Sequence, residues 1–309
     1  MSSRSDPLGT TRPGRIEFAL LAAICLAWGT SYMFTKIAVG TLTPLTLIAA
    51  RTLVASVAMI VLARAQGGIR LSPHDLPMLV VLGLASGTIP LLLIATSVSY
   101  VDSSVTATAM ALVPVIAAFY ATLGGESTSL RNVAGLAMGF CGIVVLFGPE
   151  ALLAFGDSAR GAFAALGAAL IFAGSLFLAR RARHLDSLTV ATVSQIVSAV
   201  FAMGLALAID GWPAAMPPGR VVAAVTVLGL FNTAAANLLL FVLLARAGAR
   251  FTSFNNYLVP PVAVFCGSVF LGEPVGLASF AGAGLVLAGV MVATLSRSPA
   301  LPAGARPKE

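Results

Sequence analysis

Long apolar stretches alternate with short polar connections along almost the whole of this chain. The stretches are about 18 to 25 residues long, the length of helix that crosses a hydrocarbon layer roughly 30 Å thick. The connections contain helix-stopping residues, as in Gly148-Pro149 and Asp210-Gly211. The pattern predicts ten membrane-spanning helices, at Glu17–Ala38, Pro44–Ala63, Leu76–Ser97, Ser103–Leu123, Arg131–Gly148, Arg160–Arg180, Leu188–Ile209, Arg220–Leu244, Phe251–Leu271 and Leu277–Leu295.

Two residue types that are scarce in this apolar chain, proline and glutamate, recur in one arrangement. Glu126 follows Pro114 by twelve positions, and Glu273 follows Pro261 by the same distance. A Leu-Gly step stands before both glutamates. A recurrence of this kind indicates that one structural unit occurs twice.

The repeat extends in both directions from that anchor, with an offset that drifts only from 144 to 147. Matching segments include Val81-Leu82-Gly83-Leu84 with Val227-Leu228-Gly229-Leu230, and Gly135 and Gly142 with Gly282 and Gly289. The repeat predicts four parts of the chain: a tail at 1–15, a first five-helix unit at 16–150, a second at 151–297 and a tail at 298–309.

The basic residues are distributed unevenly between the two ends of the predicted spans. If the N-terminus is cytoplasmic, most arginines fall on the cytoplasmic side, and the external ends hold only Lys36, Arg160 and Arg220. This bias predicts that both termini face the cytoplasm. Because each unit has five helices, an odd number, the second unit starts from the opposite side, and the repeats are inverted.

Composition agrees with a membrane protein and argues against other classes. The chain is 59% hydrophobic and 9% charged, far from the values of soluble domains. Its three cysteines fall within spans, and no His, Cys, Asp or Glu cluster has metal-ligand spacing. No phosphate-binding glycine loop is present. We therefore expect no enzyme activity, no metal, no cofactor and no nucleic-acid partner.

A stripe of polar and aromatic residues marks one face of the first predicted helix. Trp28, Ser31 and Tyr32 lie three and four positions apart, so they share a face. Asn232 and Asn237 mark the middle of the eighth helix, where an amide exposed to lipid would be costly. We interpret these residues as part of a site for a small amphipathic solute. Packing or interhelical hydrogen bonding is the alternative for each residue taken alone.

Prolines lie near the centres of the fourth and ninth predicted helices. A proline within a helix leaves the carbonyl four residues earlier without its partner. The affected carbonyls are those of Met110, Asn256 and Tyr257, freed by Pro114, Pro260 and Pro261. Free carbonyls in a membrane should face protein or a wet cavity. The prolines are therefore predicted to be helix breaks or hinges beside the substrate site, with simple packing kinks as the alternative.

Three basic residues lie within or at the ends of spans. Lys36 ends the first helix on the external side, and Arg181 is its repeat equivalent on the cytoplasmic side. Each either attracts a carboxylate at a vestibule or extends along its helix to the interface. Arg51, inside the second helix, is interpreted as structural, holding carbonyls between helices.

The chain resembles the EamA-type branch of the drug/metabolite transporter superfamily in three features. It has ten predicted helices in two inverted halves, Trp28-Gly29 with Lys36 eight residues after the tryptophan, and a block of Pro followed by Leu-Gly and Glu that closes each half. The resemblance covers residues 16 to 297. Size and motifs are similar to the bacterial amino-acid exporters, including carriers of the YddG type. The resemblance implies export of small metabolites, with neutral or aromatic amino acids as the expected substrates. Ala173 stands where the first half has Trp28, so unequal substrate contacts are expected.

The positions of the acidic residues bear on mechanism. None of the eleven lies near the middle of a span, so no buried carboxylate is available to exchange a proton for a cation. We expect an alternating-access exporter, facilitated rather than proton-driven, in the cytoplasmic membrane of a bacterium. Its partners would be a small solute and the lipid bilayer, and a monomer is plausible. The alternatives are a proton-coupled drug efflux pump and, from another class, a small-solute channel.

Overall fold

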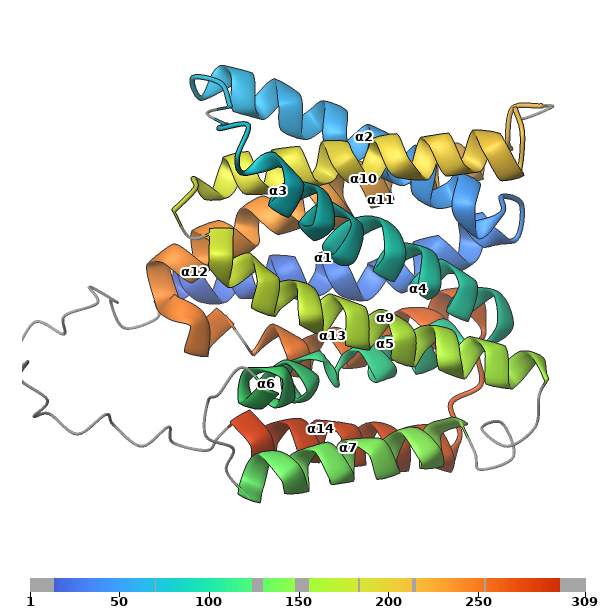
Figure 1. The fold of residues 1–309 in the computed structure, drawn as a ribbon. Helices are drawn as coiled ribbons and strands as arrows, with labels where there is room; N and C mark the ends of the chain where they lie inside the picture. The colour runs from blue at the N-terminus through green and yellow to red at the C-terminus, as the bar shows by residue number, and fades with distance from the viewer. Residues whose placement is uncertain are drawn as a thin grey trace, which may run out of the picture.

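The computed structural model describes residues 14–69, 71–123, 130–147, 156–182, 184–212, 215–252 and 254–294. All regular structure in these ranges is helical, and the helices run alongside one another in one bundle (Figure 1). This confirms an all-α fold.

The first half contributes five spans. They are formed by α1 (Arg15–Val39), α2 (Pro44–Ala65), the continuous run of α3 (Leu76–Gly83), η1 (Leu84–Thr88) and α4 (Ile89–Tyr100), the broken pair α5 (Ser103–Met110) and α6 (Val113–Leu123), and α7 (Leu130–Phe147). The segment η1 is a π-helix, which is wider than an α-helix by about one residue per turn.

The second half repeats this order. Its spans are α9 (Asp157–Ala179), followed by the short 3-10 helix η2 (Arg180–Ala182), then α10 (Ser187–Ile209), the continuous run of α11 (Gly219–Gly229), π-helix η3 (Leu230–Ala235) and α12 (Ala236–Thr252), then α13 (Asn255–Leu271) and α14 (Leu277–Thr294). The two π-helices follow Gly83 and Gly229, which are equivalent in the sequence repeat.

Length and hydropathy agree with ten crossings. Among the described residues, seven helices are long and apolar enough to span a membrane, and three shorter apolar helices lie at Val133–Leu146, Asn255–Leu271 and Leu277–Val292. The predicted boundary between the eighth and ninth spans is wrong, because α12 runs on to Thr252 and α13 begins only at Asn255. The stretch Ala245 to Arg250 resembled a connection, but alanine and arginine are strong helix formers, and basic residues suit a helix C-terminus.

Contacts between the halves follow a two-fold pattern. The helix α7 packs along α14, and α2 packs along α10, so each of these pairs joins equivalent helices. The contact of α4 with α9 is matched by that of α12 with α1, and the contact of α1 with α13 by that of α9 with α6. Exchanging every helix for its equivalent leaves these contacts unchanged. The bundle is therefore built from two repeats related by approximate two-fold symmetry.

Glycines allow close approach at two equivalent crossings, of α3 with α10 and of α11 with α2. A Cβ added to Gly83 would lie 2.9 Å from the Cβ of Val197, and one added to Gly229 would lie 2.6 Å from that of Val54. Such distances are too short for real carbon atoms, so both crossings require glycine. Small residues at helix crossings are the usual means of tight packing in membranes, where lipid removes the hydrophobic drive between helices.

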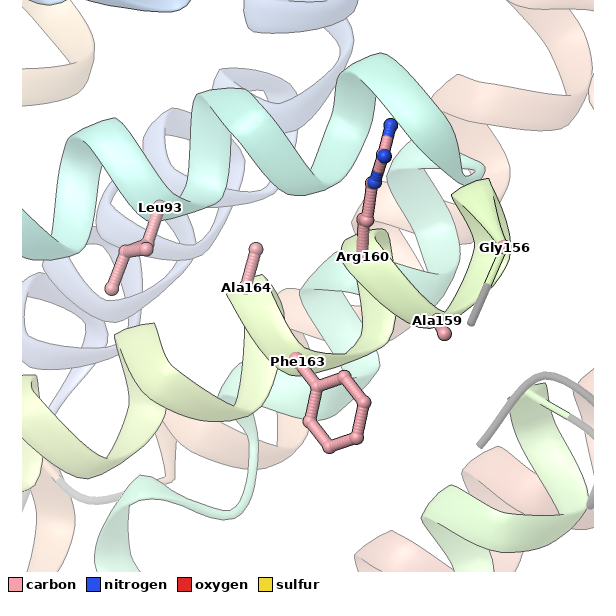
Figure 2. A pocket seen from close by; sticks show the side chains of 6 residues that line it. All are labelled: Leu93, Gly156, Ala159, Arg160, Phe163 and Ala164. Atoms are coloured by element: carbon pink, nitrogen blue, oxygen red, sulfur yellow. The ribbon is translucent and has the colours of Figure 1, made fainter. Parts of the chain in front are cut away.

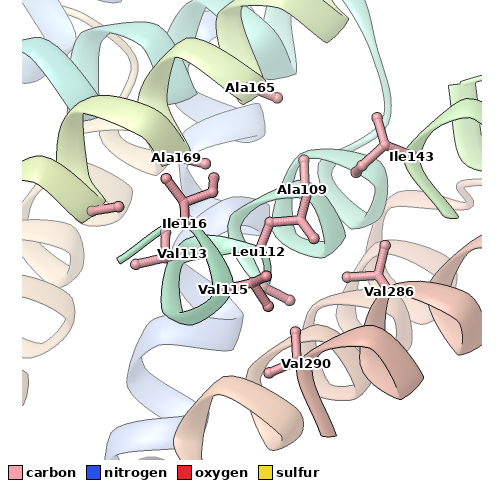
Figure 3. Packing of buried hydrophobic residues seen from close by; sticks show 12 residues of the cluster. Ala109, Leu112, Val113, Val115, Ile116, Ile143, Ala165, Ala169, Val286 and Val290 are labelled. Atoms are coloured by element: carbon pink, nitrogen blue, oxygen red, sulfur yellow. The ribbon is translucent and has the colours of Figure 1, made fainter. Parts of the chain in front are cut away.

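The largest buried cluster joins both halves near α7 and α14 (Figure 3). Val113 and Ile116 of α6 face the small Ala165 and Ala169 of α9. On the other side, the cluster extends through Leu112 to α14. Alternating large and small side chains let these helices interdigitate.

Candidate functional site

Three of the predicted substrate-site residues lie in one cluster at the meeting of the halves. Tyr32 is 9% exposed and belongs to a buried group that includes Leu243 of α12 and Val259 of α13. Trp28 and Met110, both half-buried, pack against the same group. The first helix thus presents its aromatic face to helices of the second half. Ser31, on the same face, is also 9% exposed.

Tyr257 of α13 adjoins this cluster through Met110. Both side chains pack against the core between α6, α7, α9 and α14. The hydroxyl of Tyr257 donates a hydrogen bond to the carbonyl oxygen of Val290, at 3.2 Å. Asn256, the preceding residue, is half-buried. Met110 is therefore the link between the aromatic pair on α1 and the tyrosine on α13.

The two asparagines of the eighth span have different surroundings. Asn232 lies in η3, is 2% exposed, and uses its side-chain amide to donate to the carbonyl of Ala27 and to Oγ1 of Thr30. It therefore joins η3 to α1. Its side-chain oxygen has no hydrogen-bond partner within the described residues. Asn237 lies one turn further on, half-buried in α12. A substrate contact stays a prediction for both residues.

The prolines of the two halves occupy different local structures. The fourth span is interrupted at Ala111 and Leu112, so Pro114 stands in the first turn of α6, where its missing amide proton would have no partner in any case. Pro260 and Pro261 instead lie inside α13, which continues through them. A role as a helix break or hinge stays a prediction for all three prolines.

The predicted vestibule residues differ in their contacts. The Lys36 ammonium donates to the carbonyl oxygen of Val101 at 2.7 Å, which ties the end of α1 to the connection after α4. Arg181 is exposed in η2. Attraction of a substrate carboxylate by either residue is untested and stays a prediction.

Glu273 connects the two halves at the start of α5. One carboxylate oxygen accepts from the Ser103 amide at 2.8 Å, and the other accepts from the Ser103 hydroxyl at 3.0 Å and the Ser104 amide at 3.3 Å. The first amides of a helix lack partners within it, and a carboxylate there also suits the helix dipole. The glutamate of the second repeat thus caps a helix of the first half. Its equivalent, Glu126, lies outside the described residues.

A second carboxyl group adjoins that cap. Burial raises the pKa of Asp102, the charge of Glu273 raises it further, and the nearby Lys36 ammonium acts in the opposite direction. Glu273 itself is 8% exposed. Sequence patterns alone do not bring Lys36, Asp102 and Glu273 together, because the three residues lie far apart along the chain.

A hollow of about 520 Å³ lies away from this cluster, between α4 and the start of α9 (Figure 2). It is lined by Leu93, Gly156, Ala159, Arg160, Phe163 and Ala164. Its arginine is exposed and pairs with Asp157 at 3.2 Å. None of the predicted substrate-site residues contributes to this hollow.

A duplicated, all-helical membrane bundle with aromatic and polar side chains where its halves meet defines the class of polytopic membrane transporters. Within that class, the chain belongs to the EamA-like transporter family, whose sequence profile matches it twice, over residues 15–148 and 159–295. The chain is therefore a multi-pass membrane protein that carries small molecules across a lipid bilayer.

Relatives and a solved structure agree with this assignment. The chain is 24% identical over 284 residues to the uncharacterized transporter YvbV of Bacillus subtilis, covering 90% of this chain and 92% of that protein. It is 22% identical over 290 residues to an uncharacterized transporter of Archaeoglobus fulgidus, covering 91% and 99%. A crystal structure 20% identical in sequence aligns with a TM-score of 0.66 over 92% of this chain and 98% of the other, and shows the fold alone.

Proposed function

We propose that this transporter exports neutral and aromatic amino acids by alternating access in the cytoplasmic membrane of a bacterium. The observation that carries the proposal is the cluster of Trp28, Tyr32 and Met110, which joins α1 and α5 to α12 and α13. Flat aromatic faces and a flexible thioether suit a bulky apolar side chain. In inverted-repeat carriers, the substrate site lies where the two halves meet.

Alternating access requires the two ends of the bundle to open in turn. In this proposal the Glu273 cap and the Lys36 contact close the external end, because both join helices across the α5 start. Opening that end would break the contacts of Glu273 with Ser103 and Ser104. The two-fold contact pattern supports a rocking motion of one half against the other.

Transport in this proposal is driven by the solute's own gradient. The acidic side chains of the described residues lie at helix ends or in connections: Glu17, Asp75, Asp102, Asp157, Asp186, Asp210 and Glu273. A pump that exchanges protons for cationic drugs needs a carboxylate at mid-depth to bind both in turn. The placement of these residues therefore favours a facilitated carrier over such a pump.

The test is uptake into liposomes that contain the purified protein. Labelled phenylalanine, leucine and alanine are compared with a cationic dye, with and without an imposed pH gradient. We expect saturable amino-acid uptake that persists after the proton gradient is collapsed, and acceleration by unlabelled amino acid on the opposite side. Dye uptake that depends on the pH gradient would favour an efflux pump, and flux without saturation or acceleration would favour a channel.

A further inference from the structure

Arg51 holds a permanent positive charge inside the bundle. It lies about two turns into α2 and is 4% exposed. Arginine does not lose its proton in proteins, so burial cannot neutralise it. A charge held within a membrane is costly, and such residues mark solute pathways unless another group balances them.

No such balancing group is found among the described residues. The Nε atom donates to Oγ1 of Thr233, at 2.9 Å, which is the one hydrogen bond of this side chain in that part of the chain. The Thr233 hydroxyl donates its own proton to the carbonyl of Leu228, at 2.8 Å, so a lone pair of its oxygen is directed at Arg51. The ion pairs of the described residues involve Arg160, His184 and Arg246 instead. One neutral hydroxyl orients a guanidinium and leaves its charge uncompensated.

The helix crossing at Arg51 does not itself require arginine. A Cβ on Gly229 would lie 3.0 Å from the carbonyl oxygen of Arg51, and one on Gly83 would lie 2.7 Å from that of Ser194. A valine three positions later completes each contact. Ser194 is therefore the structural equivalent of Arg51 in the other half. The same crossing is made there with a small side chain, so the arginine is an addition confined to one half.

The π-helix η3 links Arg51 to the helix that carries the aromatic pair. Asn232, the residue before Thr233, donates to Oγ1 of Thr30 in α1, so the hydroxyl partner of Arg51 belongs to a segment that contacts this helix. The phenol of Tyr32 carries no charge, so it does not balance the guanidinium. A buried positive charge beside an aromatic surface matches a ligand with an acidic head and an apolar body. The planar fork of arginine suits a carboxylate in particular.

We propose that Arg51, oriented by Thr233, binds the carboxylate of the transported solute while the apolar part of the solute packs on Trp28. This inference rests on the proposed function and narrows it. A substrate must carry an acidic group, because its bound carboxylate balances the buried charge of Arg51. Cationic amines are excluded from the site because they would meet Arg51.

The first test changes the ligand and uses the natural protein. Thermal stabilisation of the purified chain is measured with phenylalanine, 3-phenylpropionate, phenylalaninamide and phenethylamine. We expect the two carboxylates to stabilise the protein and the two compounds without a carboxylate to have no effect at the same concentration. Equal stabilisation by phenethylamine or phenylalaninamide would overturn the proposal. Equal stabilisation by chloride or phosphate would identify a free-ion site and would also overturn the assignment to the solute.

The second test changes the arginine. Because hydrogen bonds to charged groups are strong, Arg51→Gln should weaken binding of 3-phenylpropionate by roughly ten- to a hundredfold. Arg51→Lys keeps the charge and loses the planar fork, so its affinity for 3-phenylpropionate should lie between those of the natural protein and Arg51→Gln. Arg64→Gln, at the exposed end of the same helix, is the matched control and should bind as the natural protein does. If Arg51→Gln does not fold, the lysine variant and the ligand series still test whether Arg51 binds the carboxylate.

The outcomes separate this inference from the proposed function. If 3-phenylpropionate binds in an Arg51-dependent way while liposomes take up no amino acid, the anion site stands and the amino-acid proposal fails. If liposomes take up phenylalanine equally well with the natural protein and with Arg51→Gln, the amino-acid proposal stands and the role of Arg51 is disproved.

Discussion

At the scale of single residues, a side chain's neighbours decide its role more than its type does. Lys36 and Arg51 are both basic residues of the first two spans, yet Lys36 ties a carbonyl at a helix end and Arg51 lies buried beside a hydroxyl. Trp28 and Tyr32 differ in the same way from Trp212, which is 82% exposed.

Trp28 should contribute more to the binding of large substrates than of small ones. Contacts between aromatic groups are worth roughly 0.5–1.5 kcal/mol beyond the area that they bury, so Trp28→Ala should raise the KM for phenylalanine by about two- to tenfold. Tyr257→Ala should also raise the KM for phenylalanine. The measurement is liposome uptake of phenylalanine and alanine at matched protein content. Equal effects on both substrates would mean that these residues serve packing.

Asp102 should make stability depend on pH. Its pKa is raised in the folded protein, first by burial and then by Glu273. Between the ordinary carboxyl pKa, about 4, and the raised value, the folded state binds more protons than the unfolded state, so stability falls as pH rises. Relative to Asp102→Asn, the natural protein should therefore gain thermal stability as the pH is lowered from 7 towards 4. A relative loss on acidification, measured by thermal unfolding in detergent, would contradict the assignment.

At the scale of helices, close crossings and π-helices position the residues of the candidate site. Gly83 and Gly229 each lie in close contact with a helix of the opposite half, and each directly precedes a π-helix. In η3 the wider turn is accompanied by the bond from Thr233 to the carbonyl five residues earlier. The same segment presents Asn232 to α1 and Thr233 to α2. The π-helix η3 thus lies at the proposed site, and π-helices are frequent at functional sites.

Gly229 should be intolerant of a side chain. In Gly229→Ala the new carbon would lie 2.6 Å from the Cβ of Val54, so the helices must separate, at a cost of about 1–3 kcal/mol. Gly204→Ala in α10 is the control, because a Cβ there meets open space, and it should be neutral or stabilising by up to about 1 kcal/mol. Unfolding by denaturant in detergent compares the two. Equal stability of both variants would show that the crossing is looser than described.

At the scale of the whole molecule, duplication explains how the helices pack, whereas individual residues differ between the two halves. Equivalent helices make equivalent contacts, as the pairs α2 with α10 and α7 with α14 illustrate. Individual residues break the symmetry. Ser194 occupies the position in the second half that is equivalent to Arg51, and Ala173 occupies the position equivalent to Trp28 in the sequence repeat. A symmetric scaffold supports exchange between two opposed states, whereas one site for one solute requires unequal side chains.

The inverted arrangement predicts the sides of the membrane on which connections lie. A cysteine introduced at Gln66, after α2, should react with an impermeant reagent only from the cytoplasm, and one at Gly276, before α14, only from outside. Both positions are exposed. The background should lack the three native cysteines, of which Cys141 is exposed. Labelling of both positions from one side would disprove the predicted inversion of the repeats.

Sequence alone determined the apolar helices, their approximate ends and their duplication, because solvation by lipid depends on local composition and because repeated residues are visible without a structure. It also placed Trp28, Tyr32 and Met110 near one another through helix periodicity and the proline pattern. The tertiary structure alone decided where helices break or widen, that Glu273 caps a helix 170 positions away, and that Arg51 meets Thr233 182 positions away. Such contacts depend on how helices pack, and packing joins residues whose distance in sequence carries no local signal.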